Sequence, residues 1–331
     1  MLKEIKFVQG AVSRKDFVPA LNHFHIKGGK ILGYNGAIAL STPIDLNIDC
    51  SPKSTPFVKA IQTCTDTVEL HMTPNGRLAV RSGKFTAYVD CIEEGHPNIE
   101  PEGTDVKLDG SLLPALKILG PFVAEDASRP WSRGVLFRGN SAFATNNIIA
   151  VEHWLGYQFP VDINIPVEAI DEILRINEEP IGLKIAENSA TFIFEGDRWL
   201  RCQFLSTSWP AIDKILEKES NCVPIPEGLY KALEDLKPFV DDLRRVHFFE
   251  GRIATSPTDG VGASVDIQGL PAVGCFNIAH LMLLEGIANR ADFSMHPNPC
   301  IFYGDKTRGA IVGMTYIPSK KKRGQKDEEE D

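Results

Sequence analysis

The chain has 331 residues, of which 43% are hydrophobic and 24% charged, and its net charge is −9. This composition is typical of a soluble globular protein, and the length suggests about two or three domains. No stretch approaches 18 consecutive apolar residues, which excludes a membrane-spanning helix. The N-terminus lacks the apolar core of a signal peptide, so a cytoplasmic protein is expected. The acidic balance argues against a protein that coats nucleic acid with its whole surface.

Strand–turn–strand patterns recur at a regular interval along the chain. They lie at 30–40, 141–151 and 251–265, and each has a turn centred on asparagine or serine. Aligning Gly33, Ala144 and Ala254 gives offsets of 111 and 110 residues. Apolar residues at three- and four-residue spacing then predict helices at 55–64, 166–176 and 276–287.

A β-hairpin is predicted to close each repeat. Asn75-Gly76 is a strong turn dipeptide, and further turns are expected at Asn188-Ser189, at Gly196-Asp197, near Asn298 and at Gly304-Asp305. The offsets from Asn75 to Asn188 and from Asn188 to Asn298 are 113 and 110 residues. We therefore predict an α+β fold of three tandem modules, each with two helices against antiparallel sheet. The alternative is a set of unrelated α+β domains that share this generic order.

Segments rich in proline, glycine and charge mark the boundaries between the repeats. They predict modules at 1–104, 105–219 and 220–318, followed by a disordered charged tail at 319–331.

Two stretches contain the letters Pro-Ala-Leu. In "SLLPALKIL" (111–119), Ser111 as N-cap puts Pro114 at the third helical position, where no N–H group is needed. In "DFVPALNHF" (16–24) a strand follows almost at once, so a shortened first helix is expected in the first module.

Four short stretches stand in a particular order: "GVLF" (134–137), "FATNNIIAVEH" (143–153), "TSWPAIDKIL" (207–216) and "IVGMTYIP" (311–318). In this order and spacing they resemble bacterial DNA sliding clamps, the β subunit of the replicative DNA polymerase. The resemblance covers the architecture of residues 1–318. Asn146, Asn147, Ile148 and Ile149 replace the family's Asp, Gly, His and Arg, which suggests a divergent, phage-encoded version.

The resemblance implies a ring that two chains close head to tail around duplex DNA, with helices lining the hole. Such a ring contacts phosphates without reading bases. The implied partners are duplex DNA, the replicative polymerase, a clamp loader and a second copy of the chain, with no cofactor and no membrane. The candidate DNA-contacting residues are Arg14, Lys15, Lys53, Lys59, Lys117, Arg129, Trp131, Arg133, Arg175, Lys231 and Lys237. The alternative for Trp131 is a packing role under the second sheet. The alternative for each basic residue is a solvated position on the surface.

The family also binds partner peptides in a groove between the second and third modules. Carried over residue by residue, the groove wall is expected at Thr145, Asn147, Ile148, Ile149, Ala150, Pro210, Lys214, Ile215, Val312, Met314, Thr315 and Tyr316. The Ile148-Ile149 pair would make this groove more apolar and change the preferred peptide.

No catalytic motif occurs in the chain. The eight histidines show no H-x-x-x-H spacing, and G-x-S-x-G, Walker A and G-x-G-x-x-G motifs are missing, so no enzyme and no catalytic residue are expected. His23 and His25 alternate as in a strand and could hold a metal, but ordinary strand histidines are the simpler interpretation. The seven cysteines occur singly and are interpreted as buried thiols. The alternative function is a clamp-like scaffold or adaptor that binds replication or repair partners without encircling DNA.

Overall fold

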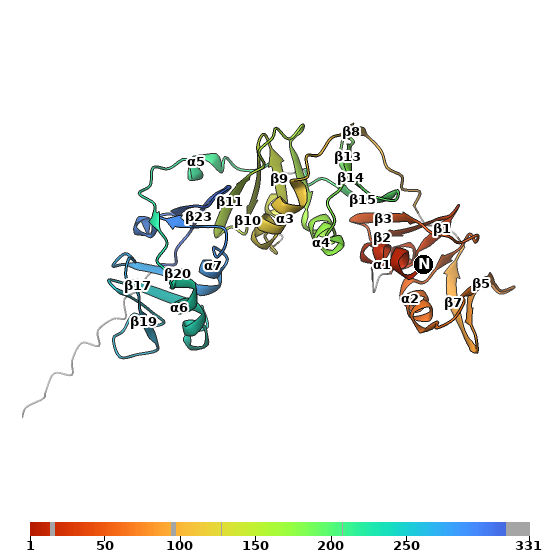
Figure 1. Ribbon diagram of the computed structural model, residues 1–331, viewed down its shortest axis with the longest axis horizontal. Helices are drawn as coiled ribbons and strands as arrows, with labels where there is room; N and C mark the ends of the chain where they lie inside the picture. The colour runs from red at the N-terminus through yellow and green to blue at the C-terminus, as the bar shows by residue number, and fades with distance from the viewer. Residues whose placement is uncertain (14–16, 94–96, 127, 207, 316–331) are drawn as a thin grey trace, which may run out of the picture. The chain divides into compact units, whose positions relative to one another are not determined.

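The structure is a computed structural model that describes residues 1–13, 17–93, 97–126, 128–206 and 208–315. It divides into two compact units, and Figure 1 labels many of their elements. Unit 1 contains Met1–Ala144 and Leu155–Ser208, and unit 2 contains Thr145–Trp154 and the described residues from 209 onward. No helix in the described ranges has the length and apolarity needed to cross a bilayer.

Unit 1 holds four of the α-helices. They are α1 (Leu2–Val8), α2 (Ser54–Thr63), α3 (Leu112–Leu119) and α4 (Val167–Ile176), and the short 3-10 helices are η1 (Gln9–Ala11), η2 (Pro19–Asn22), η3 (Gly120–Phe122) and η4 (Pro130–Ser132). Its strands are β1 (His25–Lys27), β2 (Lys30–Tyr34), β3 (Ile38–Pro43), β4 (Ser51–Pro52), β5 (Glu69–Met72), β6 (Arg77–Ser82), β7 (Phe85–Ile92), β8 (Thr104–Val106), β9 (Gly134–Arg138), β10 (Ser141–Thr145), β12 (Ile163–Pro166), β13 (Gly182–Ile185), β14 (Ser189–Phe194) and β15 (Arg198–Gln203).

Unit 2 holds the remaining elements. Its helices are α5 (Asp213–Leu216), α6 (Leu229–Leu236), α7 (Ile278–Met282), η5 (Lys237–Phe239) and η6 (Phe293–Met295). Its strands are β11 (Ile149–Trp154), β16 (Val223–Pro224), β17 (Arg245–Phe249), β18 (Arg252–Ala254), β19 (Ser264–Asp266), β20 (Gly274–Asn277), β21 (Arg290–Ala291), β22 (Cys300–Tyr303) and β23 (Thr307–Ile311).

The sheets of each unit are antiparallel. In unit 1 the strand orders are β1-β2-β3-β15-β14-β13-β8, β4-β7-β6-β5 and β12-β9-β10. In unit 2 they are β11-β23-β22-β21-β16 and β19-β18-β17-β20. Leu40 of β3 faces Leu200 of β15, and Ala150 of β11 faces Ala310 of β23, so strands far apart in the sequence pair in both units.

The predicted strand–turn–strand repeats are confirmed, and their turns share a local cause. The Asn35 side-chain oxygen accepts hydrogen bonds from the amides two and three residues later, at 3.0 and 2.9 Å. Asn146 does the same at 3.1 and 2.8 Å, and the Ser256 hydroxyl accepts from Thr258 N at 3.1 Å. Short polar side chains of this kind stabilise tight turns. The turn chemistry therefore recurs with the repeat.

Helices also recur in contacting pairs, namely α1 with α2, α3 with α4, and α6 with α7. The first helix of each pair continues into a 3-10 turn, η1, η3 or η5. The expected shortening of the first helix amounts to one residue: α1 has seven residues, and α3 and α6 have eight each. The "DFVPALNHF" segment instead contains η2, whose counterpart η4 begins at Pro130, 111 residues after Pro19.

Pro114 lies at the third position of α3, as predicted. Ser111 is the N-cap residue, but its side chain makes no capping hydrogen bond. The Glu179 carboxylate instead accepts from the amides of Leu112 and Leu113, at 3.0 and 2.8 Å. Proline has no N–H group, and Ala115 N already bonds to Ser111 O at 3.1 Å. Every amide of the first turn is thereby satisfied.

The helix predicted at 276–287 is shorter than expected, because its first residues belong to a strand and its last residues form turns. Phe276 and Asn277 still belong to β20, which pairs with β17. The Asn277 side chain then accepts from Ala279 N at 2.9 Å and starts α7 at Ile278. After Met282 the chain continues in turns, with Leu284 N bonded to Leu281 O at 3.0 Å. The module boundaries at 104/105 and 219/220 stay predictions.

Candidate functional site

Four lysines lie on the solvent side of the helix pair α1–α2 in unit 1. Lys3 and Lys6 are exposed on α1, and Lys53 and Lys59 are exposed at the start and in the middle of α2. The opposite sides of both helices are buried, with Ile5, Phe7 and Val8 on α1 and Phe57, Val58, Ala60 and Ile61 on α2. We call Lys3, Lys6, Lys53 and Lys59 the lysine face. Ammonium groups on solvent-facing helix surfaces suit phosphate contact.

Sequence reasoning found only half of the lysine face. Lys53 and Lys59 were predicted, whereas Lys3 and Lys6 were missed because no helix was expected at 2–8. Apolar residues at Leu2, Ile5 and Val8 have helical spacing and could have shown it. The predicted Arg14 and Lys15 lie outside the described residues.

The second helix pair, α3–α4, is less basic. Lys117 is exposed on α3. Arg175 of α4 donates to the carbonyl oxygens of Phe7 and Lys6, at 2.7 and 3.3 Å, and pairs with Glu172 at 2.6 Å. The guanidinium of Arg175 therefore holds the end of α1. In the same helix as Arg175, burial and the nearby Glu168 raise the pKa of the Asp171 carboxyl.

The 129–133 segment brings cationic and aromatic side chains to the surface of unit 1. Arg129 is exposed and Trp131 is half-buried, so the indole has both packed and open surface. Arg133 pairs with Glu168 of α4 at 3.1 Å. Asn164 donates from its side-chain amide to Trp131 O at 2.9 Å, which anchors the turn. Of the three, Arg129 is the most accessible.

The predicted lysines of the third helix pair lie near carboxylates. Lys231 donates to Asp235 one turn later, at 2.8 Å, and this hydrogen bond raises the pKa of the Lys231 ammonium. Lys237 is exposed in η5. The exposed Glu234 lies between them on α6, so this surface mixes both signs of charge.

Three segments of unit 2 bring the predicted peptide-binding residues together. They are the β10–β11 turn, helix α5 and the residues after β23. Val312 N bonds to Ile148 O at 2.9 Å, and α5 contacts β23. Ile148, Ile215 and Val312 are 38%, 39% and 39% exposed, and we call these three residues with Met314 the apolar patch. Exposed apolar side chains from several segments are typical of a protein-binding surface.

The other predicted wall residues support or border this patch. Thr145 is buried and donates from Oγ1 to Ile149 O at 2.7 Å, which closes the turn. Ile149 is fully buried, so of the isoleucine pair only Ile148 adds apolar area to the surface. Met314 is anchored through its main chain, between Cys275 O at 2.7 Å and His296 Nε2 at 3.0 Å. The rest are exposed or half-buried: Asn147, Ala150, Pro210, Lys214 and Thr315. Tyr316 lies outside the described residues.

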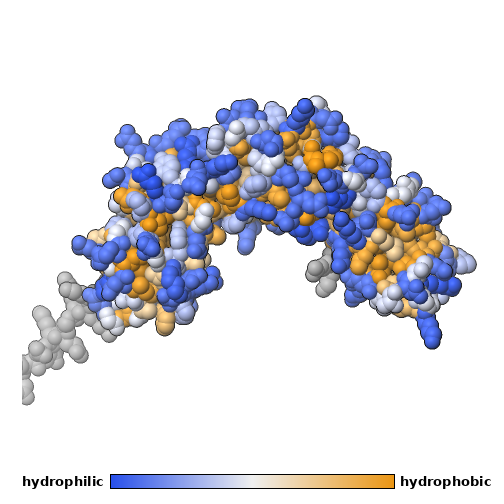
Figure 2. Space-filling view, viewed as in Figure 1, coloured by the Kyte–Doolittle hydropathy of each residue, from blue (hydrophilic) through white to orange (hydrophobic). Residues whose placement is uncertain are grey.

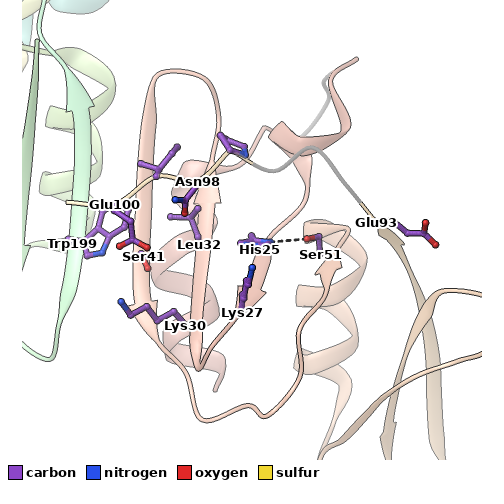
Figure 3. A pocket seen from close by; sticks show the side chains of 12 residues that line it. His25, Lys27, Lys30, Leu32, Ser41, Ser51, Glu93, Asn98, Glu100 and Trp199 are labelled. Carbon is purple, nitrogen blue, oxygen red and sulfur yellow. Dashed lines mark hydrogen bonds between the residues drawn. The ribbon is translucent and has the colours of Figure 1, made fainter. Parts of the chain in front are cut away.

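Unit 1 also contains a cavity of about 470 Å³ that sequence reasoning did not predict (Figure 3). Strands β1, β2 and β3 form one side, and Trp199 and the segment 97–100 form another. Lys27 and Lys30 line it together with Glu93 and Glu100, so its charges nearly balance. The other lining residues are His25, Leu32, Ser41, Ser51, Pro97, Asn98 and Ile99.

His25 is one of the titratable side chains that line this cavity. Its Nδ1 lies 3.0 Å from the Ser51 hydroxyl, and burial lowers the pKa of its imidazole. His23 turns instead toward Pro19 O, at 2.7 Å. In the described part of the chain, no group of three or more His, Cys, Asp or Glu side chains is placed to hold a metal ion.

The visible surface is mostly hydrophilic, with hydrophobic side chains gathered in separate areas (Figure 2). One such area lies over α2, β1 and β7 of unit 1.

Known proteins resemble the chain in structure rather than in sequence. No family model matches it, and no curated protein matches it by sequence. The β sliding clamp of C. crescentus has 14% identity and a TM-score of 0.81, over 95% of this chain and 97% of that one. The DNA polymerase III beta subunit of Thermotoga maritima has 15% identity and a TM-score of 0.80, over 96% and 97%. The DNA polymerase sliding clamp of Bacillus subtilis has 15% identity and a TM-score of 0.79, over 96% and 97%. The chain therefore has the fold of the bacterial DNA polymerase III beta subunits, the sliding clamps.

Proposed function

We propose that the protein is a DNA sliding clamp, a processivity factor that encircles duplex DNA as a head-to-tail dimer. In this proposal it tethers the replicative polymerase through the apolar patch and is placed on DNA by a clamp loader. It acts without a catalytic residue or cofactor, in the cytoplasm of a bacterium or of a phage-infected cell.

The observation that carries the proposal is a strand pairing that occurs twice. In unit 1, β3 pairs with β15, and in unit 2, β11 pairs with β23. By the repeat, β3, β11 and β19 are equivalent strands, and so are β7, β15 and β23. The third pairing of this kind would join β19 to β7.

Both of these strands have an open edge in the described part of the chain. β19 is the last strand of its sheet and pairs with β18. β7 pairs with β6 from Phe85 to Asp90, and with β4 only at Cys91 and Ile92. Unpaired strand edges are templates for pairing with another chain. Pairing β19 of each copy with β7 of the other would close two chains into a ring.

The charges support a DNA-facing role for the helices. The chain is acidic as a whole, yet the solvent sides of α1 and α2 carry the four lysines of the lysine face. Contacts between lysines and DNA phosphates are strong in aggregate and independent of base sequence, and a protein that slides along DNA needs both properties. Lys117 and Arg129 are also exposed in unit 1. Arg133, Arg175 and Lys231 have carboxylate partners.

The carboxylates on α4 and α6 favour the second candidate, a scaffold with the clamp fold that does not encircle DNA. Light scattering distinguishes the two, because the clamp is expected at twice the chain mass of 36.5 kDa. Tyr88 on β7 is 58% exposed, and Tyr88→Asp should give a monomer by placing a charge at the proposed strand pairing. Met72→Asp, on the far strand β5 of the same sheet, is the matched control and should remain a dimer.

Topological retention is the decisive test of encirclement. With a bacterial clamp loader and ATP, the protein should stay on a nicked circular plasmid through gel filtration and leave it when the plasmid is linearised. A persistent monomer without retention would support the scaffold instead.

A further inference from the structure

Two cysteines of unit 1 meet across neighbouring strands. Pro52 of β4 lies opposite Cys91 of β7. Cys50 is two residues before Pro52, and side chains two apart on an extended strand share a face. Cys50 and Cys91 are therefore diagonal neighbours on one face of this strand pair.

The backbone holds Cys50 firmly at this place. Its N–H and C=O both bond to Ile26 of β1, at 2.9 Å each. On the other side, Lys53 N bonds to Asp90 O at 2.9 Å, next to Cys91. The segment 50–53 is thus held between β1 and β7, and α2 begins directly after it at Ser54.

The two thiols are free and lie on the same face of this strand pair. Both cysteines are half-buried, so small reagents in solvent can reach them. The interaction between the two thiols lowers the pKa of Cys91 and raises that of Cys50, while the Cys91 thiol donates to Val89 O at 3.7 Å. These directions point to Cys91 as the nucleophile, since the thiolate is the reactive form.

Cys64 provides a contrast within the same unit. It is also free and half-buried, but its thiol donates to Ala60 O of its own helix at 3.2 Å. A thiol beside a second thiol can be resolved to a disulfide after oxidation, which requires the second thiol to lie within reach.

We propose that Cys50 and Cys91 form a redox-active dithiol, which a hydroperoxide converts reversibly into a disulfide. The Cys91 thiolate attacks one peroxide oxygen, the O–O bond breaks, and the leaving hydroxide takes up a proton to give water. The sulfur of Cys50 then attacks the Cys91 sulfenic acid. The S–O bond breaks, and the Cys50 proton leaves with the hydroxyl as a second water. Two thiols are oxidised while one hydrogen peroxide is reduced, and a dithiol reductant reverses the change.

The disulfide would link the segment just before α2 covalently to β7. The closed loop would run from 50 to 91 and contain β4, α2, β5, β6 and most of β7. Closing a loop restricts the unfolded chain, so the oxidised protein should melt at a higher temperature than the reduced one.

The test treats the full native chain with hydrogen peroxide, removes the excess with catalase, and blocks free thiols with N-ethylmaleimide in denaturant. Non-reducing peptide mass spectrometry should show the Cys50 peptide linked to the Cys91 peptide, two hydrogens lighter than the sum of the reduced peptides. The Cys64 peptide should carry the maleimide. Dithiothreitol should restore maleimide labelling of both cysteines.

Single substitutions test the assigned roles. In Cys50→Ser, peroxide should leave Cys91 as a sulfenic acid that dimedone traps. In Cys91→Ser, Cys50 should stay reduced and give no dimedone adduct, while Cys64→Ser should form the disulfide as the unchanged protein does. Peroxide that leaves Cys50 and Cys91 open to maleimide, or that oxidises Cys64 first, would overturn the proposal. Equal dimedone labelling of the two single variants would overturn the assignment of Cys91 as nucleophile.

Discussion

Arg175 of α4 donates a hydrogen bond from Nη2 to the carbonyl oxygen of Phe7 in α1, over 2.7 Å. The last carbonyls of a helix have no partner within it, and a cation near them is favourable. Glu172 completes the contact by pairing with Arg175, and it lies so close to Gly10 that a Cβ there would meet its carboxylate. A residue predicted to contact DNA thus joins two helix pairs of unit 1.

The main effect of Arg175→Ala should therefore be on the stability of the folded protein rather than on DNA binding. We expect a loss of about 1.5 kcal/mol in the free energy of unfolding, the lower end for hydrogen bonds to a charged group, because the guanidinium is partly exposed. Urea unfolding followed by circular dichroism measures it. Lys117→Ala, an exposed residue on α3, is the control and should change the free energy by less than about 0.5 kcal/mol. Unchanged stability of Arg175→Ala would contradict the bridging role.

Glu179 caps α3 through the amides of Leu112 and Leu113. Glu179→Ala leaves both donors without their acceptor, and we expect a loss of about 1 kcal/mol in the free energy of unfolding. Glu179→Gln keeps one acceptor oxygen, so its free energy of unfolding should lie between those of the unchanged protein and Glu179→Ala. Glu187→Ala, which removes an exposed carboxylate from a turn, controls for the change in charge. Equal unfolding midpoints for Glu179→Ala and Glu187→Ala would refute the cap.

The lysine face should determine how DNA binding responds to salt. Each phosphate contact contributes about 0.9 to the slope of log K against log salt. The double substitution of Lys6 and Lys59 by alanine should reduce that slope by about 1.8. Fluorescence anisotropy with a labelled duplex across a salt series gives the value. Lys184→Ala, whose lysine pairs with Asp105 on a sheet edge, should leave the slope unchanged.

Ile148 should dominate peptide binding at the apolar patch, because the neighbouring Ile149 is buried. Ile148→Asp should weaken binding of a partner peptide at least about tenfold, the effect typical of an apolar anchor. Ile181→Asp, at an exposed site in unit 1, is the matched control. Titration of a fluorescent bacterial clamp-binding peptide measures both. If that peptide binds the unchanged protein as tightly as it binds an ordinary bacterial clamp, the altered specificity predicted from Ile148 is wrong.

His153 and His247 should make unit 2 sensitive to acid. Both are buried, and burial lowers the pKa of each imidazole below the ordinary value of 6.5, with Lys306 and Arg245 adding to the shift. The unfolded chain then binds more protons as the pH falls below about 6.5, and stability decreases there while staying level above it. Melting temperatures at about pH 7.5, 6.5 and 5.5 test this. His153→Asn should reduce the dependence, whereas His71→Asn, at an exposed site on β5, should preserve it.

Much of the fold was predictable from local patterns. The strand–turn–strand repeats, the helices at 54–63 and 167–176 and the place of Pro114 depend on residues a few positions apart. The α1 helix was missed because seven residues are too few to form a stable helix alone, and burial of Ile5, Phe7 and Val8 against the unit stabilises it. Half of the lysine face was missed with it.

The sequence by itself determined the repeat and its spacing, the turn chemistry of Asn35 and Asn146, and the apolar side of each long helix. Only the tertiary structure decided that Arg175 holds α1, that Glu179 caps α3, and that Cys50 meets Cys91. The physical reason is distance along the chain. Turns and helix faces depend on neighbours within about one helical turn. The pairing of β3 with β15 and the contact of Arg175 with Phe7 join residues more than 150 positions apart, whose proximity depends on how the whole unit packs.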